Sequence, residues 1–107
     1  MTQVALENGT MLTLCANLGA MVKIEQVGKT IDAKSEPLLH TLMCVYALLM
    51  GFDAHTKFTP EALQEMCTAE DWANLLRAYK DEMKTWTDKF RADTPAEAGD
   101  GAEQGED

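Results

Sequence analysis

The pattern that decides the fold lies in residues 71–90, which read DWANLLRAYKDEMKTWTDKF. Large apolar residues recur there at alternating steps of four and three, among mostly polar neighbours. An average period of about 3.5 residues places them along one line of a helix. We call these six residues the apolar stripe: Trp72, Leu76, Tyr79, Met83, Trp86 and Phe90. The sequence predicts a long amphipathic helix, and this stripe needs a covering surface in water.

The expected helix begins after Thr68, which with Asp71 forms a variant of the capping box. It runs from about Ala69 to about Ala92, roughly 36 Å at 1.5 Å per residue. A domain of this size has a radius of gyration of only about 12 Å. We therefore expect the helix to extend beyond the body of the domain.

The two halves of the apolar stripe have different expected roles. The first half, with Leu75 beside it, is expected to pack within the chain. Met83, Trp86 and Phe90 are expected to meet a partner protein or a second copy, because Trp is enriched among interface anchors. The alternative is that the whole stripe is the core face of the helix.

The N-terminal segment 3–15, QVALENGTMLTLC, has the pattern of a β-hairpin. Val4 and Leu6 alternate with smaller or polar residues, and Leu12 and Leu14 do the same on the far side of Asn8-Gly9. Asn-Gly is a strong signal for a tight turn. An isolated two-stranded ribbon is marginal in water, so this hairpin must lie on an apolar surface.

Three shorter helices are expected between the hairpin and the long helix. The first covers about residues 16–27, with Asn17 as its N-cap and Gly28 as a left-handed terminating residue. In the second, Ser35 is the expected N-cap, and Gly51 is expected to follow the last residue. Its sequence LLHTLMCVYALLM is apolar on nearly every face, which is typical of a central helix.

The third short helix is expected to follow Thr59 as N-cap, with Pro60 at its first position, and to end near Cys67. The expected fold is thus mainly α: an N-terminal β-hairpin, then about four helices. Residues 1–92 form one domain in this interpretation. Residues 93–107 are rich in Gly, Glu and Asp and are predicted to be a disordered acidic tail.

Charge and hydropathy exclude several classes of function. The net charge of the 107-residue chain is −9, and six acidic residues without a base lie in residues 93–107. No basic stripe is evident, so direct binding to nucleic acid is not expected. The longest apolar run, residues 42–52, is about half of the roughly 20 residues that a membrane span needs. Three widely spaced cysteines indicate reduced thiols in a cytoplasmic protein.

Few residues have the spacing of a metal or catalytic site. His40 and Cys44 lie four apart on the central helix and begin a zinc-ligand pattern that His55 or Cys67 would complete. No second close pair follows, so we expect a buried thiol beside a histidine, with no metal, cofactor or enzymatic activity. The acidic pairs at residues 70–71 and 81–82 are interpreted as solvated helix faces.

Three segments together resemble a known family. They are residues 6–31, LENGTMLTLCANLGAMVKIEQVGKTI; residues 38–51, LLHTLMCVYALLMG; and residues 57–79, KFTPEALQEMCTAEDWANLLRAY. A short hairpin, a small-residue helix ending in Glu25 and Gly28-Lys29, an apolar central helix and a terminal amphipathic helix follow in the same order. This layout, over residues 4 to about 90, is similar to that of the tail assembly chaperones of long-tailed bacteriophages.

The resemblance implies a non-enzymatic, homo-oligomeric protein of the infected or lysogenic host cytoplasm that is absent from the mature virion. It implies that the chain shields the helical tape-measure protein and helps to recruit tail-tube protein. The alternatives left open are an acidic phage inhibitor or nucleic-acid mimic, acting through its acidic tail, and another oligomeric helical adaptor.

Overall fold

A computed structural model describes the backbone of residues 1–93 and the side chains of residues 1–89. The elements in chain order are β1 (Thr2–Ala5), β2 (Met11–Leu14), α1 (Leu18–Thr30), α2 (Pro37–Phe52), α3 (Pro60–Met66) and α4 (Ala69–Asp93). The mainly α fold with an N-terminal hairpin is therefore confirmed. The predicted disordered tail lies outside the described residues, apart from Asp93 at the end of α4.

The hairpin forms with the predicted alternation of buried and exposed positions. β1 and β2 pair antiparallel, with Val4 opposite Leu12. Both side chains point to the same face of the hairpin. They are buried, as is Leu14, so this face of the hairpin packs on the core. The turn contains three residues: the Leu6 N–H donates to the Thr10 carbonyl at 2.8 Å, and Gly9 has a φ of 92°. Glycine takes this left-handed conformation without a steric penalty.

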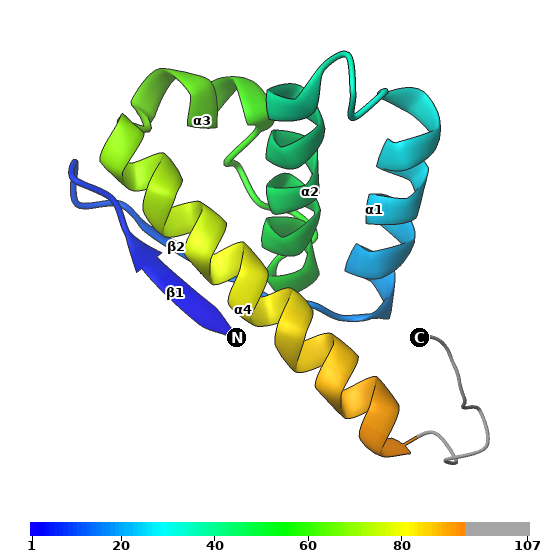
Figure 1. The fold of residues 1–107 in the computed structure, drawn as a ribbon. Coiled ribbons are helices and arrows are strands. Elements are labelled where there is room, and N and C mark those ends of the chain that lie inside the picture. The colour runs from blue at the N-terminus through cyan, green and yellow to red at the C-terminus, as the bar shows by residue number, and fades with distance from the viewer. Residues whose placement is uncertain (94–107) are drawn as a thin grey trace.

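The central helix α2 contacts α1, α3, α4 and β2 (Figure 1). Four of its buried apolar residues join the hairpin residues in one core, which also includes Leu63 and Leu75. Two of them, Val45 and Leu48, are fully enclosed. The prediction of a central apolar helix is therefore confirmed.

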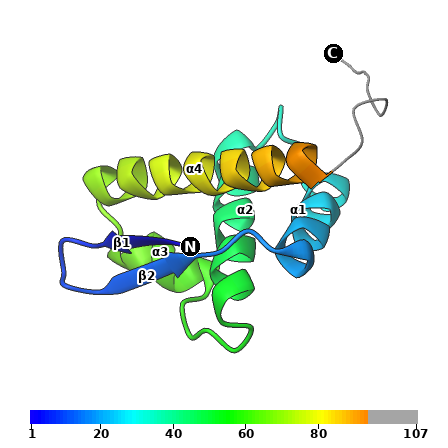
Figure 2. The same cartoon turned by 90° about the horizontal axis from the view of Figure 1, so that it is seen from below.

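The long helix α4 runs alongside the hairpin and crosses α2 (Figure 2). Its predicted start is confirmed: the Asp71 N–H donates to Thr68 Oγ1 at 3.1 Å, and the Thr68 N–H donates to Asp71 Oδ2 at 3.1 Å. This reciprocal pair is the capping box expected from the sequence. The start of α3 is confirmed as well, since Thr59 Oγ1 accepts from the Ala62 N–H at 3.2 Å.

Two predicted glycine helix ends are wrong. Helix α1 begins at its predicted cap, Asn17, but continues through Gly28 to Thr30, and among the described glycines only Gly9 has a positive φ. Gly51 lies inside α2, where it faces the segment that joins β2 to α1. A Cβ on Gly51 would stand 2.2 Å from the Cys15 carbonyl oxygen. Gly51 thus permits close packing of two backbones instead of ending a helix.

The predicted N-cap of α2 is also wrong. The cap position is Glu36, which makes no side-chain hydrogen bond to the helix. Ser35 Oγ instead donates to Asp32 Oδ2 at 2.9 Å, within the turn that precedes the helix. The fixed φ of Pro37, at the first helical position, still favours a helix start here.

Candidate protein-contact face

The apolar stripe lies beside the buried face of α4. Among residues 69–89 of α4 the buried residues, which we call the buried row, are Asp71, Leu75, Ala78 and Glu82. Each is followed by a stripe residue, and one position corresponds to a rotation of about 100°. The described members of the stripe are therefore half-buried, at one edge of the buried face. The predicted packing of the first half is confirmed for Trp72 and Tyr79, which contact the core.

Two carboxylates in the buried row contradict the expectation of solvated acidic pairs. Asp71 is 1% exposed, and its Oδ1 accepts from the Glu7 backbone N–H at 3.0 Å, beside the hairpin turn. Glu82 is 5% exposed and accepts from the Ala16 N–H at 3.0 Å and from Thr2 Oγ1 at 2.5 Å. Asp81 is exposed, as expected. The buried carboxylates attach α4 to both ends of the hairpin through charge-assisted hydrogen bonds.

The surroundings of Glu82 favour its ionised form. Burial by itself raises the pKa of this carboxyl, because it penalises the charged form. The hydrogen bonds from Thr2 and Ala16 and the ammonium group of Met1, 3.3 Å away, outweigh that effect and hold the pKa below its ordinary value. Glu82 is thus a buried but satisfied anion, placed where α4 meets the open end of the hairpin.

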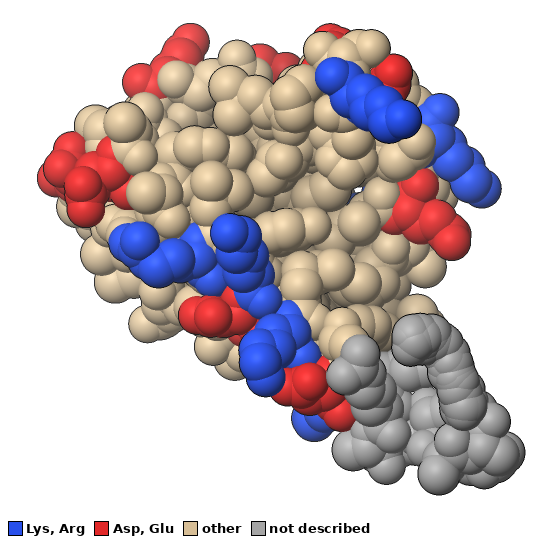
Figure 3. All heavy atoms as spheres, viewed as in Figure 1, with Lys and Arg blue, Asp and Glu red and all other residues tan. Residues whose placement is uncertain are grey.

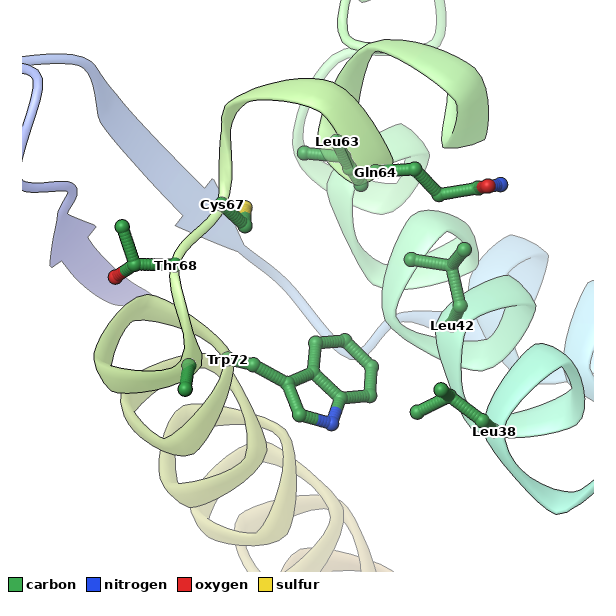
Figure 4. A pocket seen from close by; sticks show the side chains of 8 residues that line it. Leu38, Leu42, Leu63, Gln64, Cys67, Thr68 and Trp72 are labelled. Atoms are coloured by element: carbon green, nitrogen blue, oxygen red, sulfur yellow. The ribbon is translucent and has the colours of Figure 1, made fainter.

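A hollow separates α4 from the start of α2. It has a volume of about 280 Å³ and is lined by Leu38, Leu42, Leu63, Gln64, Cys67, Thr68, Ala69 and Trp72. The Trp72 indole points across it toward Leu38 and Leu42 (Figure 4). Leu38 is 66% exposed and borders the hollow, so apolar surface is accessible to solvent at this place. We call the hollow together with the described stripe residues the contact face.

Helix α4 continues well past its last contact with the hairpin. Glu82 is its last buried residue among those described, and 11 further residues follow to Asp93. That length corresponds to about 16 Å at 1.5 Å per residue. This part of α4 projects beyond the hairpin in Figure 1. It holds the second half of the stripe, where Met83 and Trp86 are half-buried; the Phe90 side chain is outside the described residues.

Charged side chains border the contact face and do not cover it. In Figure 3, blue and red atoms follow α4, and uncharged surface extends from α4 toward α2 and α3. Arg77, Lys80 and Lys84 are exposed on the solvent side of the stripe. In the sequence these cations are interpreted, together with Asp81 and Asp88, as a solvated helix face of mixed charge, and all five residues are exposed.

His40 and Cys44 come together as the helical spacing predicts, with Nδ1 and Sγ 3.9 Å apart. Burial raises the pKa of the Cys44 thiol, although a hydrogen bond with Tyr79 lowers it in part. Burial, and then the charge of Cys44 and its hydrogen bond, raise the pKa of Tyr79 to about 12. The Cys44 thiol and the Tyr79 hydroxyl are therefore both neutral near pH 7, and their contact holds Tyr79 of the stripe against α2.

The other candidate metal ligands lie apart from this pair. His55 is exposed in the loop after α2, and Cys67 follows α3 and lines the hollow. Among the described side chains, those of residues 1–89, no three His, Cys, Asp or Glu residues are grouped so as to hold a metal ion. All three cysteines are free thiols, and only Cys44 is fully buried.

Comparison with protein-family models, with curated proteins and with solved structures finds no match to this chain. None of the helices formed by residues 1–93 combines the length and apolarity needed to cross a membrane. We therefore infer function from the apolar surface of the contact face and from the charges that border it.

Proposed function

We propose that this chain is a tail assembly chaperone of a long-tailed bacteriophage. In this proposal it is non-enzymatic, shields the helical tape-measure protein and helps to recruit tail-tube protein. It acts in the cytoplasm of the infected or lysogenic host and is absent from the mature virion. The resemblance of residues 4 to about 90 to that family supports the proposal, together with the confirmed order of hairpin, central helix and long terminal helix.

The observation that carries the proposal is the half-buried stripe on a helix that extends past its own domain. Trp72, Tyr79 and Trp86 present aromatic surface to solvent in part, and the hollow beside Trp72 is open next to Leu38. Recognition of an amphipathic helix needs an apolar groove or strip with pockets at helical spacing. A tape-measure protein is a long helical chain with an apolar seam, which aggregates unless it is covered.

The proposal also includes contacts between copies of the chain. A second apolar surface lies away from the contact face, on α1 and the end of α2. Leu18 is 69% exposed there, Phe52 53% and Val22 45%. Leu18 and Phe52 line one shallow groove with Met50. We assign contacts between copies to this surface, which leaves the contact face available to the client.

Co-expression with the tape-measure protein of the same phage tests the proposal. The tape-measure protein should remain soluble only when this chain is present, and the two should co-purify. A matched pair of variants locates the effect: Leu38→Asp at the hollow should abolish co-purification, whereas Leu18→Asp on α1 should weaken contacts between copies and leave co-purification intact. Both leucines are highly exposed in the first turn of a helix, so each variant should fold. A tape-measure protein that stays soluble without this chain would contradict the assignment.

A further inference from the structure

The contact face has one open border, and that border is basic. On one side of the stripe lies the buried row of α4. The residues on the other side each follow a stripe residue by one position: Ala73, Arg77, Lys80, Lys84 and Thr87. All five are exposed. This border therefore contains three cations and no acid.

Two of the three cations have an acid four positions later on the helix: Asp81 follows Arg77, and Asp88 follows Lys84. Lys84 is the last of the three cations along α4, and its Nζ lies 2.6 Å from Asp88 Oδ2. Arg77 donates to the side chain of Asn74, which is uncharged. Lys80, in the middle of the row, has no ion-pair partner among the described side chains of residues 1–89. The centre of the border is therefore a positively charged edge beside an apolar strip.

A second copy of the same helix fits this face poorly. In an antiparallel pair, equivalent borders meet, so the cations of one border would lie near the cations of the other, and like charges repel. In a parallel pair, the border would meet the opposite flank of the partner helix. That flank is the buried row, where Glu82 is already bonded to Thr2 and Ala16.

We propose that the contact face binds an amphipathic helix of a partner protein whose apolar seam has acidic residues along one side. The acidic side lies against Arg77, Lys80 and Lys84, and one large apolar side chain of the seam enters the hollow between Leu38 and Trp72. This inference rests on the proposed function, since it specifies the chemistry of the client helix. Charge complementarity sets the orientation and selectivity of such a contact more than its total strength.

Two synthetic helical peptides test the inference. They share a seam of leucines at heptad spacing, and one carries Glu, the other Lys, along one side of it. Calorimetric titration of the full chain should give about tenfold tighter binding of the Glu peptide, mainly from the two exposed charge pairs at Arg77 and Lys80. The preference should shrink between about 50 mM and about 500 mM salt, because salt screens exposed charges.

Charge-reversal variants give the decisive comparison. Arg77→Glu with Lys80→Glu should remove or reverse the preference for the Glu peptide. Lys23→Glu with Lys29→Glu on α1 changes the net charge equally and should leave the preference intact. Equal binding of both peptides, absence of binding, or equal effects of the two double variants would each overturn the inference.

The two proposals fail in different ways. A chain that prefers the Glu peptide but does not keep the tape-measure protein soluble retains the contact chemistry and loses the phage assignment. A chain that protects the tape-measure protein but binds both peptides equally retains the assignment and loses the acidic-seam inference.

Discussion

Glu82 on the last helix accepts a hydrogen bond from the backbone N–H of Ala16, just after the hairpin, at 3.0 Å. Eleven residues earlier on the same face, Asp71 accepts from the Glu7 N–H. Eleven helical residues span about 16 Å, and the five-residue step from Thr2 to Glu7 in a strand spans about the same. The two carboxylates therefore match the two ends of the hairpin, which fixes the rotation of α4 and leaves the stripe at the edge.

Glu82→Ala should destabilise the fold by about 1–3 kcal/mol, because it leaves the buried Ala16 N–H without an acceptor. Urea unfolding followed by circular dichroism measures the change. Asp81→Ala is the matched control: it makes the same change at the exposed neighbouring position and should alter stability by less than about 0.5 kcal/mol. Equal losses in the two variants would contradict the anchoring role of Glu82.

The stability should also depend on Glu82 in acid. Its pKa in the folded chain lies below the ordinary value of 4.5, so its contribution is complete above the unfolded-state pKa. That contribution is lost as the pH falls through the lower, folded-state pKa. Glu82→Gln should therefore be less stable than the parent near neutral pH, and the difference should close in acid. Urea midpoints between about pH 7 and about pH 3 check this expectation; a difference that is constant with pH would refute it.

The two misassigned glycines should respond in opposite directions to alanine. Gly51→Ala places a Cβ 2.2 Å from the Cys15 carbonyl oxygen, a backbone atom, and should cost about 1–3 kcal/mol. Gly28→Ala meets nothing within 4 Å inside α1 and should stabilise the chain by about 0.5–1 kcal/mol. Thermal unfolding of both variants distinguishes these outcomes. Destabilisation by Gly28→Ala would mean that α1 does not continue through this position.

Stripe and core residues of α4 should separate binding from folding. Trp86→Ala combined with Phe90→Ala should abolish co-purification with the client and leave helicity nearly unchanged, since Trp86 lies past the last buried residue. Leu75→Ala, at a fully enclosed position, should instead lower stability by about 2–5 kcal/mol. Circular dichroism and pull-down of the same samples measure both properties. Unfolding of the Trp86 and Phe90 double variant would show that the stripe belongs to the core.

Deletion of residues 94–107 tests the acidic-mimic alternative. These residues supply five of the acidic side chains and no base. A protein that acts through its apolar contact face should retain client binding without them, with lower solubility as the main change. A nucleic-acid mimic should lose binding to its target. Pull-down at matched protein concentration measures the difference.

The sequence alone determined the features that depend on near neighbours. The capping residues Thr59 and Thr68 bond to backbone groups three positions away, so their roles follow from local spacing. The alternation around Asn8-Gly9 gave the hairpin and its buried face for the same reason, because a strand has a period of two. The 3.5-residue period of the stripe predicted α4 with nearly its observed bounds, Ala69–Asp93.

Only the tertiary structure decided which side of each element is enclosed. In the sequence Asp71 and Glu82 have the pattern of solvated helix residues, and their burial depends on Glu7 and Ala16, more than 60 positions away. Gly51 has the pattern of a helix end, yet its role is set by the Cys15 backbone across the fold. Local hydrogen bonds and periodicity depend on residues that are close together in the sequence. The rotation of a helix about its own axis is instead set by the partners that satisfy its buried polar groups.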